Sequence, residues 1–168
     1  GMSFHGGLIG ALLAGIAAAK LTRIPYLTLA DLGCIGAPLG LLFGRCANFI
    51  NGELWGAPTD AAWGVVFGGA AGTMPRHPSQ LYEAFLEGVV IFAVLYLLSR
   101  RMPPRPRGTF LGTFLVMSGC FRFLVEFVRE PDAQLGYLWG GWLTMGQLLS
   151  VPLILVGAGV LVYALVVK

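Results

Sequence analysis

The sequence predicts an all-α polytopic membrane protein with about five transmembrane helices. Only 11% of its 168 residues are charged, against about 25% in typical soluble proteins. Hydrophobic residues make up 57% and the mean hydropathy is +0.78, so too few polar side chains exist to cover a soluble surface. Disorder is excluded as well, because disordered chains combine low hydrophobicity with high net charge. The apolar residues also gather in long runs, as they do in membrane-spanning helices.

Five apolar runs define the predicted helices, and a spanning helix needs about 20 apolar residues. The runs cover residues 6–19, 27–50, 81–98, 109–128 and 145–167. The first run is short, whereas the other four are long enough to span. Three prolines between Arg100 and Arg107 predict an extended link between the third and fourth helices, because proline breaks a helix interior.

The connections between these helices differ in charge, which predicts the orientation. Basic residues follow the first, third and fifth runs, and five spans place all three positions on one side. They are Lys20, Arg23, Arg100, Arg101, Arg105, Arg107 and Lys168. The positive-inside rule makes that side cytoplasmic, together with the C-terminus. The opposite side carries residues 51–80, which are rich in glycine and tryptophan, and residues 129–144; all four tryptophans lie there.

Several classes of function are disfavoured by what the sequence contains. The net charge of +3 does not indicate a nucleic-acid partner, because the basic residues form no face with interleaved aromatics. Cys34, Cys46 and Cys120 have no metal-ligand spacing and are expected to pack as small apolar side chains. No P-loop, serine elbow or zinc-protease helix is present in the sequence. We therefore expect neither a metal nor an organic cofactor.

The first group of candidate functional residues lies at the outer end of the second run. Arg45 and Asn48 are three residues apart and so share one face of a helix. Arginine offers a planar fork of donors that suits a phosphate, and the asparagine amide adds a donor and an acceptor. The alternative is structural: Arg45 pairs with Glu53 or extends to the membrane interface.

Two further groups lie at the same side of the membrane. His77 and Pro78 lead into the third run, where Glu83 and Glu87 share a face and must be paired, protonated or hydrated. For Glu87 we expect a buried salt bridge to another helix.

Arg122, Glu126 and Arg129 form one polar stripe on the fourth run. Glu126 is the expected partner of Arg122, and the stripe keeps an excess of positive charge. With Arg45 it predicts an anion site at membrane depth. His5, at the outer end of the first run, can accept a proton near neutral pH.

These motifs resemble those of the prolipoprotein diacylglyceryl transferases, bacterial membrane enzymes that lipidate lipoprotein precursors. The resemblance covers essentially the whole chain and is most specific in the run from Arg45 to Gly56. The matching segments are residues 2–7, 44–56, 58–60, 77–83, 122–129 and 130–132. The sequence departs from the family at Ser118, where the family often has a tyrosine. We expect residues 1–168 to form a single transmembrane domain, the C-terminal part of a longer enzyme.

The resemblance implies a reaction and its location. The diacylglyceryl group of phosphatidylglycerol moves to the lipobox cysteine of a preprolipoprotein, and glycerol-1-phosphate leaves. The site then faces the periplasmic side of the bacterial inner membrane. His5, Arg45 and Arg122 are the implied catalytic residues. The implied substrate-binding residues are Asn48, Glu53, Gly56, His77, Glu126 and Arg129.

Two alternatives stay open at this point. The same residues could bind a small anion in a transporter or channel, in which case no covalent product forms. The chain could also be an inactive fragment of the transferase.

Overall fold

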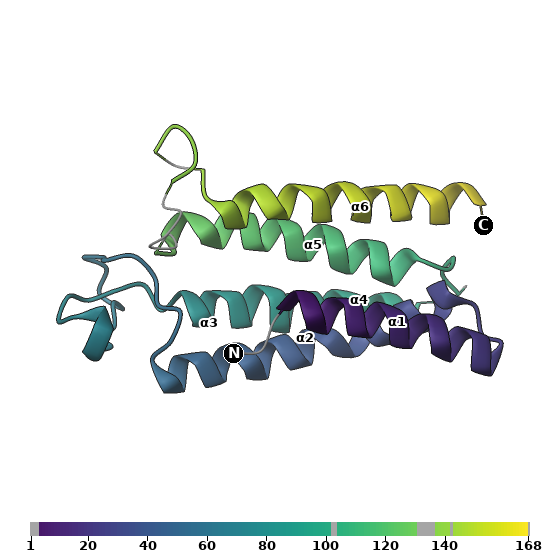
Figure 1. The fold of residues 1–168 in the computed structure, drawn as a ribbon, viewed down its shortest axis with the longest axis horizontal. Coiled ribbons are helices and arrows are strands. Elements are labelled where there is room, and N and C mark those ends of the chain that lie inside the picture. The colour runs from purple at the N-terminus through teal and green to yellow at the C-terminus, as the bar shows by residue number, and fades with distance from the viewer. Residues whose placement is uncertain (1–3, 102–103, 131–136, 142, 168) are drawn as a thin grey trace.

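The computed structural model describes residues 4–101, 104–130, 137–141 and 143–167. It is an elongated bundle of helices that run back and forth along one axis (Figure 1). The helices are α1 (Phe4–Thr22), α2 (Tyr26–Asn51), α3 (Ser79–Glu83), α4 (Ile91–Arg100), α5 (Thr109–Val125) and α6 (Met145–Val167). A π-helical segment, Ala84–Val90, joins α3 to α4, and a 3-10 turn, Glu126–Val128, extends α5.

The predicted fold class is confirmed, and the chain is an all-helical polytopic membrane protein. Among the residues that the structure describes, four helical segments are long and apolar enough to cross a membrane, and the shorter apolar helix Gly6–Thr22 precedes them. The four segments are Tyr26–Asn51, Ser79–Arg100, Thr109–Val128 and Met145–Val167. They match the last four apolar runs to within a few residues. The first run was expected to be short, and it is.

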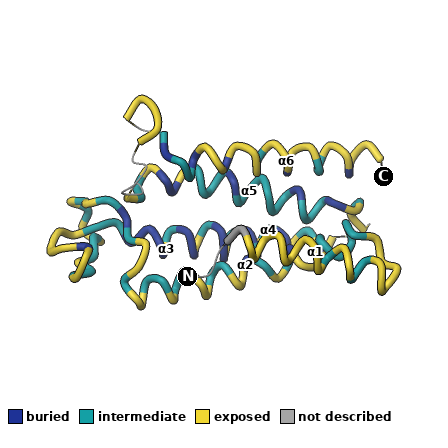
Figure 2. Tube along the Cα trace, in the orientation of Figure 1, coloured by how far each residue is buried: buried dark blue, intermediate teal, exposed yellow. Residues whose placement is uncertain are grey.

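Burial in this bundle is inverted relative to that of a soluble protein. Large apolar side chains such as Leu13, Leu155 and Val166 are exposed on the outer faces of helices. Carboxylates and amides are buried instead, among them Glu83, at 1% exposure, and Gln147, at 0%. Figure 2 shows exposed stretches along α1 and α6 and buried stretches along α3. This distribution fits a lipid environment, in which polar groups must find partners inside the bundle.

Helices α5 and α6 pack closely, because glycines lie on the face between them. A Cβ atom at Gly112 would lie 2.6 Å from the Leu161 side chain, and one at Gly119 would lie 2.6 Å from Ile154. Such stripes of small residues let two membrane helices approach closely enough for their backbones to pack. This pairing fixes the outer end of α5, where the arginine stripe lies, against the start of α6.

The opposite end of the bundle is held by a carboxylate that caps a neighbouring helix. Asp31 of α2 is buried and accepts hydrogen bonds from the backbone N–H groups of Gly108, at 2.7 Å, and Leu111, at 2.9 Å. These N–H groups lie at the start of α5, where helical backbone donors have no partner within the helix. The negative charge also matches the positive end of the α5 dipole.

Replacing Asp31 is expected to lower the stability of the fold without changing the contacts of Arg45 and Arg122 at the other end of the bundle. Asp31→Asn puts an amide donor where the carboxylate accepts, so at least one of the two hydrogen bonds is lost. We expect the free energy of unfolding to fall by about 1–2 kcal/mol, measured by thermal unfolding in detergent. Asp60→Asn, at an exposed aspartate, is the matched control. Equal stability of the two variants would contradict the role of Asp31.

Candidate functional site

One buried carboxylate lies at the centre of the candidate site. Glu83, the last residue of α3, has its side chain 2% exposed and lies within ion-pair distance of arginines from other elements. Its Oε2 is 2.7 Å from Nε of Arg45. Its Oε1 is 3.2 Å from Nη1 of Arg122 and 3.7 Å from Nη1 of Arg129. The three arginines and Glu83 are called the arginine cluster below.

The end of α2 is built by local sequence so that Arg45 is supported from its own helix. Gly52 adopts a left-handed conformation (φ 68°), and its N–H donates to the carbonyl of Phe49 while the N–H of Glu53 donates to that of Asn48. This Schellman turn reverses the chain. The amide of Asn48 then donates to the Glu53 carboxylate at 3.2 Å and accepts from Arg45 Nη1 at 3.4 Å.

The arginine stripe on the fourth span faces the same point. Arg122 Nη2 lies 3.5 Å from Oε2 of Glu126, one turn further along. Gly146, at the start of α6, leaves room for this carboxylate, because a Cβ there would lie 2.6–2.7 Å from its atoms. The start of α6 thus packs directly against the carboxylate that pairs with Arg122.

Backbone hydrogen bonds from residues 56 and 57 to His77 and Val128 attach residues 52–78 to the cluster. This contact is called the backbone crossing below. The N–H of Gly56 donates to the carbonyl of His77, and the N–H of Ala57 donates to the carbonyl of Val128, both at 2.9 Å. Gly56 also forms an antiparallel bridge with Arg129. A side chain at Gly56 would lie 2.6 Å from the His77 carbonyl oxygen, so this crossing requires glycine.

Side chains on either side of the crossing hold it in place. The Arg76 guanidinium donates to the carbonyls of Ala71, at 2.9 Å, and Gly56, at 3.2 Å, and also pairs with Glu130. The N–H of Trp63 donates to the Tyr82 hydroxyl at 2.7 Å, and that hydroxyl lies 3.0 Å from Nδ1 of His77. His77 therefore belongs to the wall beside the cluster, where its ring contacts Tyr82.

Six of the nine predicted site residues meet in one place. Two more, Gly56 and His77, adjoin this group through the backbone of Arg129. His5 lies in α1, and its side chain is outside the described residues. The six are Arg45, Asn48, Glu53, Arg122, Glu126 and Arg129.

The structure corrects one alternative considered for Arg45 and the salt bridge expected for Glu87. Arg45 pairs with Glu83 rather than with Glu53, which binds Asn48 instead. Glu87 is buried at 6% exposure, but it forms no ion pair with any residue that the structure describes. Arg122 does pair with Glu126 as expected, although its contact with Glu83 is shorter.

Sequence reasoning did not assign Glu83 or Gln80 to the site. Gln80 is 1% exposed, and its amide donates to the backbone carbonyl of Glu53 at 2.6 Å. The Ser79 hydroxyl likewise donates to the backbone carbonyl of Leu54 at 3.2 Å. The one available signal was the density of polar residues from His77 to Glu83 at the start of an otherwise apolar run.

The cluster carries an excess of positive charge. Its three guanidiniums form ion pairs with two carboxylates, Glu83 and Glu126, so the groups in direct contact carry one excess positive charge. Glu87 is buried nearby and forms no ion pair with them among the described residues. Burial, and then the nearby charge of Arg122, lower the pKa of Arg129. Nη1 of Arg129 is buried without a hydrogen-bond acceptor among the described residues. The arrangement therefore favours binding of an anion that brings its own oxygen acceptors.

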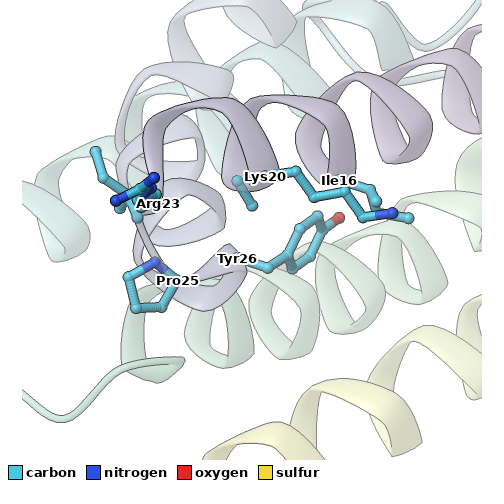
Figure 3. A pocket seen from close by; sticks show the side chains of 7 residues that line it. Ile16, Lys20, Arg23, Pro25 and Tyr26 are labelled. Atoms are coloured by element: carbon cyan, nitrogen blue, oxygen red, sulfur yellow. The ribbon is translucent and has the colours of Figure 1, made fainter.

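An open cavity elsewhere is not part of this site. It has a volume of about 440 Å³ and lies at the corner between α1 and α2, with Lys20, Arg23 and Tyr26 in its lining (Figure 3). Tyr26 begins α2, whereas Arg45 is 19 residues further along the helix, roughly 28 Å away at 1.5 Å per residue. The cavity belongs to the end of the bundle that carries Asp31.

Comparison with known proteins agrees with the motifs and the cluster. The family model for prolipoprotein diacylglyceryl transferase matches residues 1–163. Relatives named phosphatidylglycerol–prolipoprotein diacylglyceryl transferase include one from Methylococcus capsulatus, 57% identical over 157 residues, 94% of this chain and 59% of that protein. The Geobacter sulfurreducens relative is 56% identical over 157 residues, with the same coverage.

A third relative covers slightly more of the sequence. The Azotobacter vinelandii protein of the same name is 53% identical over 164 residues, 98% of this chain and 61% of that protein. The chain thus spans about three fifths of the length of the curated relatives it matches. By sequence and by the family model, it belongs to the prolipoprotein diacylglyceryl transferase family.

Proposed function

We propose that the chain carries the site at which the diacylglyceryl group of phosphatidylglycerol moves to the lipobox cysteine of a preprolipoprotein. The observation that carries this proposal is the arginine cluster: three guanidiniums that share two carboxylate partners at one point inside an apolar bundle. An anionic lipid headgroup is the ligand that such a site accepts at membrane depth. The names of the relatives, which cite the same lipid and protein substrates, support it.

The reaction exchanges one bond for another at the glyceryl carbon that bears the phosphate. The cysteine sulfur attacks as thiolate and forms the thioether C–S bond, since the thiolate is the reactive form. The C–O bond to phosphate breaks, and its electron pair stays on the phosphate oxygen of the departing glycerol-1-phosphate. The thiol proton passes to a base, a role proposed for His5.

The three arginines of the cluster and the polar residues that contact them take roles that follow from these contacts. Arg45 and Arg122 hold the phosphate and stabilise the charge that builds on the leaving oxygen, because donors in place before reaction are most effective. Asn48 and Glu53 order Arg45 or the glycerol side of the headgroup. Glu126 and Arg129 support Arg122.

The remaining two site residues act through position. Gly56 and His77 form the backbone crossing beside Arg129, so they shape the side of the site that the lipid headgroup or the peptide would contact. The proposed location is the bacterial inner membrane, with the cluster on the periplasmic side and the C-terminus in the cytoplasm. The basic residues at the opposite end of the bundle, Arg105 and Arg107 among them, support this orientation.

A mass assay tests the proposal directly. Membranes containing the chain, alone or joined to whatever coding sequence lies upstream, are mixed with phosphatidylglycerol and a lipobox peptide. We expect a diacylglyceryl mass gain on the peptide cysteine, and no gain with Arg45→Ala. Absence of the thioether from both proteins, each shown to be folded, would overturn the transferase. Uptake of a small anion under those conditions would favour a transporter, and a gain only with the upstream part would identify an inactive fragment.

A further inference from the structure

A single carboxylate serves three guanidiniums, which is more than it can satisfy. Each arginine carries five N–H donors, and Glu83 offers two oxygens, one facing Arg45 and the other shared by Arg122 and Arg129. The contact with Arg45 is close at 2.7 Å, yet Oε2 accepts no well-aligned hydrogen bond. Glu83 therefore gathers the arginines without saturating them.

The four residues come from different parts of the chain, so only the tertiary structure brings them together. Arg45 lies on α2, Glu83 ends α3, and Arg122 lies on α5, with Arg129 just beyond the 3-10 turn that extends it. Like charges at this range repel strongly in a medium of low dielectric constant. Without an anion among them, the three guanidiniums would separate or turn toward water.

Glu83 also sets the charge that the cluster offers to a ligand. Among the groups in ion-pair contact the carboxylates are Glu83 and Glu126, so the excess over these groups is one positive charge while Glu83 is ionised. If Glu83 carried no charge, the excess would be two. A phosphodiester headgroup brings one negative charge, whereas a phosphomonoester brings close to two at pH 8, because its second pKa is about 6.

We infer that Glu83 is a positioning residue that holds Arg45, Arg122 and Arg129 around one point and, through its charge, makes the site select a phosphodiester over a phosphomonoester headgroup. This inference rests on the proposed lipid-binding function of the same cluster. Glu83 acts through the arginines and forms no bond to the reacting atoms. Its replacement should therefore change both the rate of transfer and the choice of lipid.

The test compares variants that separate charge from shape. Glu83→Gln keeps the shape and removes the charge, Glu83→Asp keeps the charge on a shorter side chain, and Asp31→Asn loosens a buried carboxylate link at the other end of the bundle. Each protein is purified in detergent at pH 8. Binding of phosphatidylglycerol and of phosphatidic acid is measured by native mass spectrometry, transfer to the lipobox peptide is measured separately, and thermal unfolding monitors the fold.

The expected results differ between the variants. Glu83→Gln should lower transfer about 100-fold, since small misplacements of catalytic groups cost that much. It should also shift the ratio of the two binding constants at least about tenfold toward phosphatidic acid, because one more positive charge faces the headgroup. Glu83→Asp should regain part of the transfer and the original lipid preference. Asp31→Asn should unfold at lower temperature with both properties unchanged.

Two outcomes would overturn the inference. One is an unchanged lipid ratio in Glu83→Gln; the other is a shift of the same size in Asp31→Asn, which would make Glu83 a structural link only. The binding ratio does not depend on turnover. If the unsubstituted chain binds both lipids but makes no thioether, the proposed transfer fails while the role of Glu83 is still decided.

Discussion

We expect Arg45→Ala to lower the rate of the proposed diacylglyceryl transfer about 1000-fold, and Arg45→Lys to lower it about 100-fold. The guanidinium contacts Glu83 through Nε and Asn48 through Nη1, so its plane is fixed before any ligand arrives. Donors fixed in this way at a developing negative charge contribute factors of about 100–1000 to the rate. Lysine keeps the charge but presents a single ammonium in place of a planar fork.

The transfer rate of Arg45→Lys relative to that of Arg45→Ala separates the contribution of guanidinium geometry from that of positive charge. Transfer is measured as kcat/KM with phosphatidylglycerol and a lipobox peptide, and thermal unfolding is recorded for each protein. Glu83 retains Arg122 and Arg129 as partners in both variants, so both are expected to fold. Arg105→Lys, at an exposed position near the far end of the bundle, is the matched control and should change transfer less than about twofold. Full activity in Arg45→Lys would refute the need for the fork.

The helices could be predicted from sequence because their signal is local. Apolar runs such as residues 145–167 have the length of a span and little charge, and the structure has a helix over Met145–Val167. The first run differs because it has fewer apolar residues before Lys20. The close packing of α5 on α6 could not be predicted from sequence. Glycines such as Gly112 and Gly119 permit a close approach, but the sequence does not indicate which helix approaches them.

Only the site residues that share one helix face could be grouped from the sequence, because helix periodicity relates residues within a single helix. The stripe of Arg122, Glu126 and Arg129 follows from spacings of four and three residues, and the structure places them in one cluster. The central role of Glu83 depends on three elements meeting, and nothing local encodes that. The same holds for Asp31, whose partners are 77 and 80 residues away in sequence.

Gly56→Ala is expected to damage both stability and transfer, although Gly56 has no side chain to contribute. A Cβ atom there would lie 2.6 Å from the carbonyl oxygen of His77 and 2.7 Å from that of Val128. Both are backbone atoms, so no side-chain rotation relieves the clash. The segment must shift, and the hydrogen bonds of Gly56 and Ala57 to these carbonyls must lengthen. We expect the free energy of unfolding to fall by about 3 kcal/mol.

The expected effect on transfer arises because the backbone crossing positions Arg129. Gly56 is paired with Arg129, which contacts Glu83 at the centre of the cluster, so a shifted backbone displaces an arginine of the cluster. We expect transfer to fall about 100-fold at a temperature where the variant is still folded. Gly40→Ala is the control, because a Cβ on that α2 residue meets nothing within 4 Å, and it should leave transfer within about twofold. If Gly56→Ala unfolds earlier but transfers normally, the crossing stabilises the fold without setting the position of Arg129.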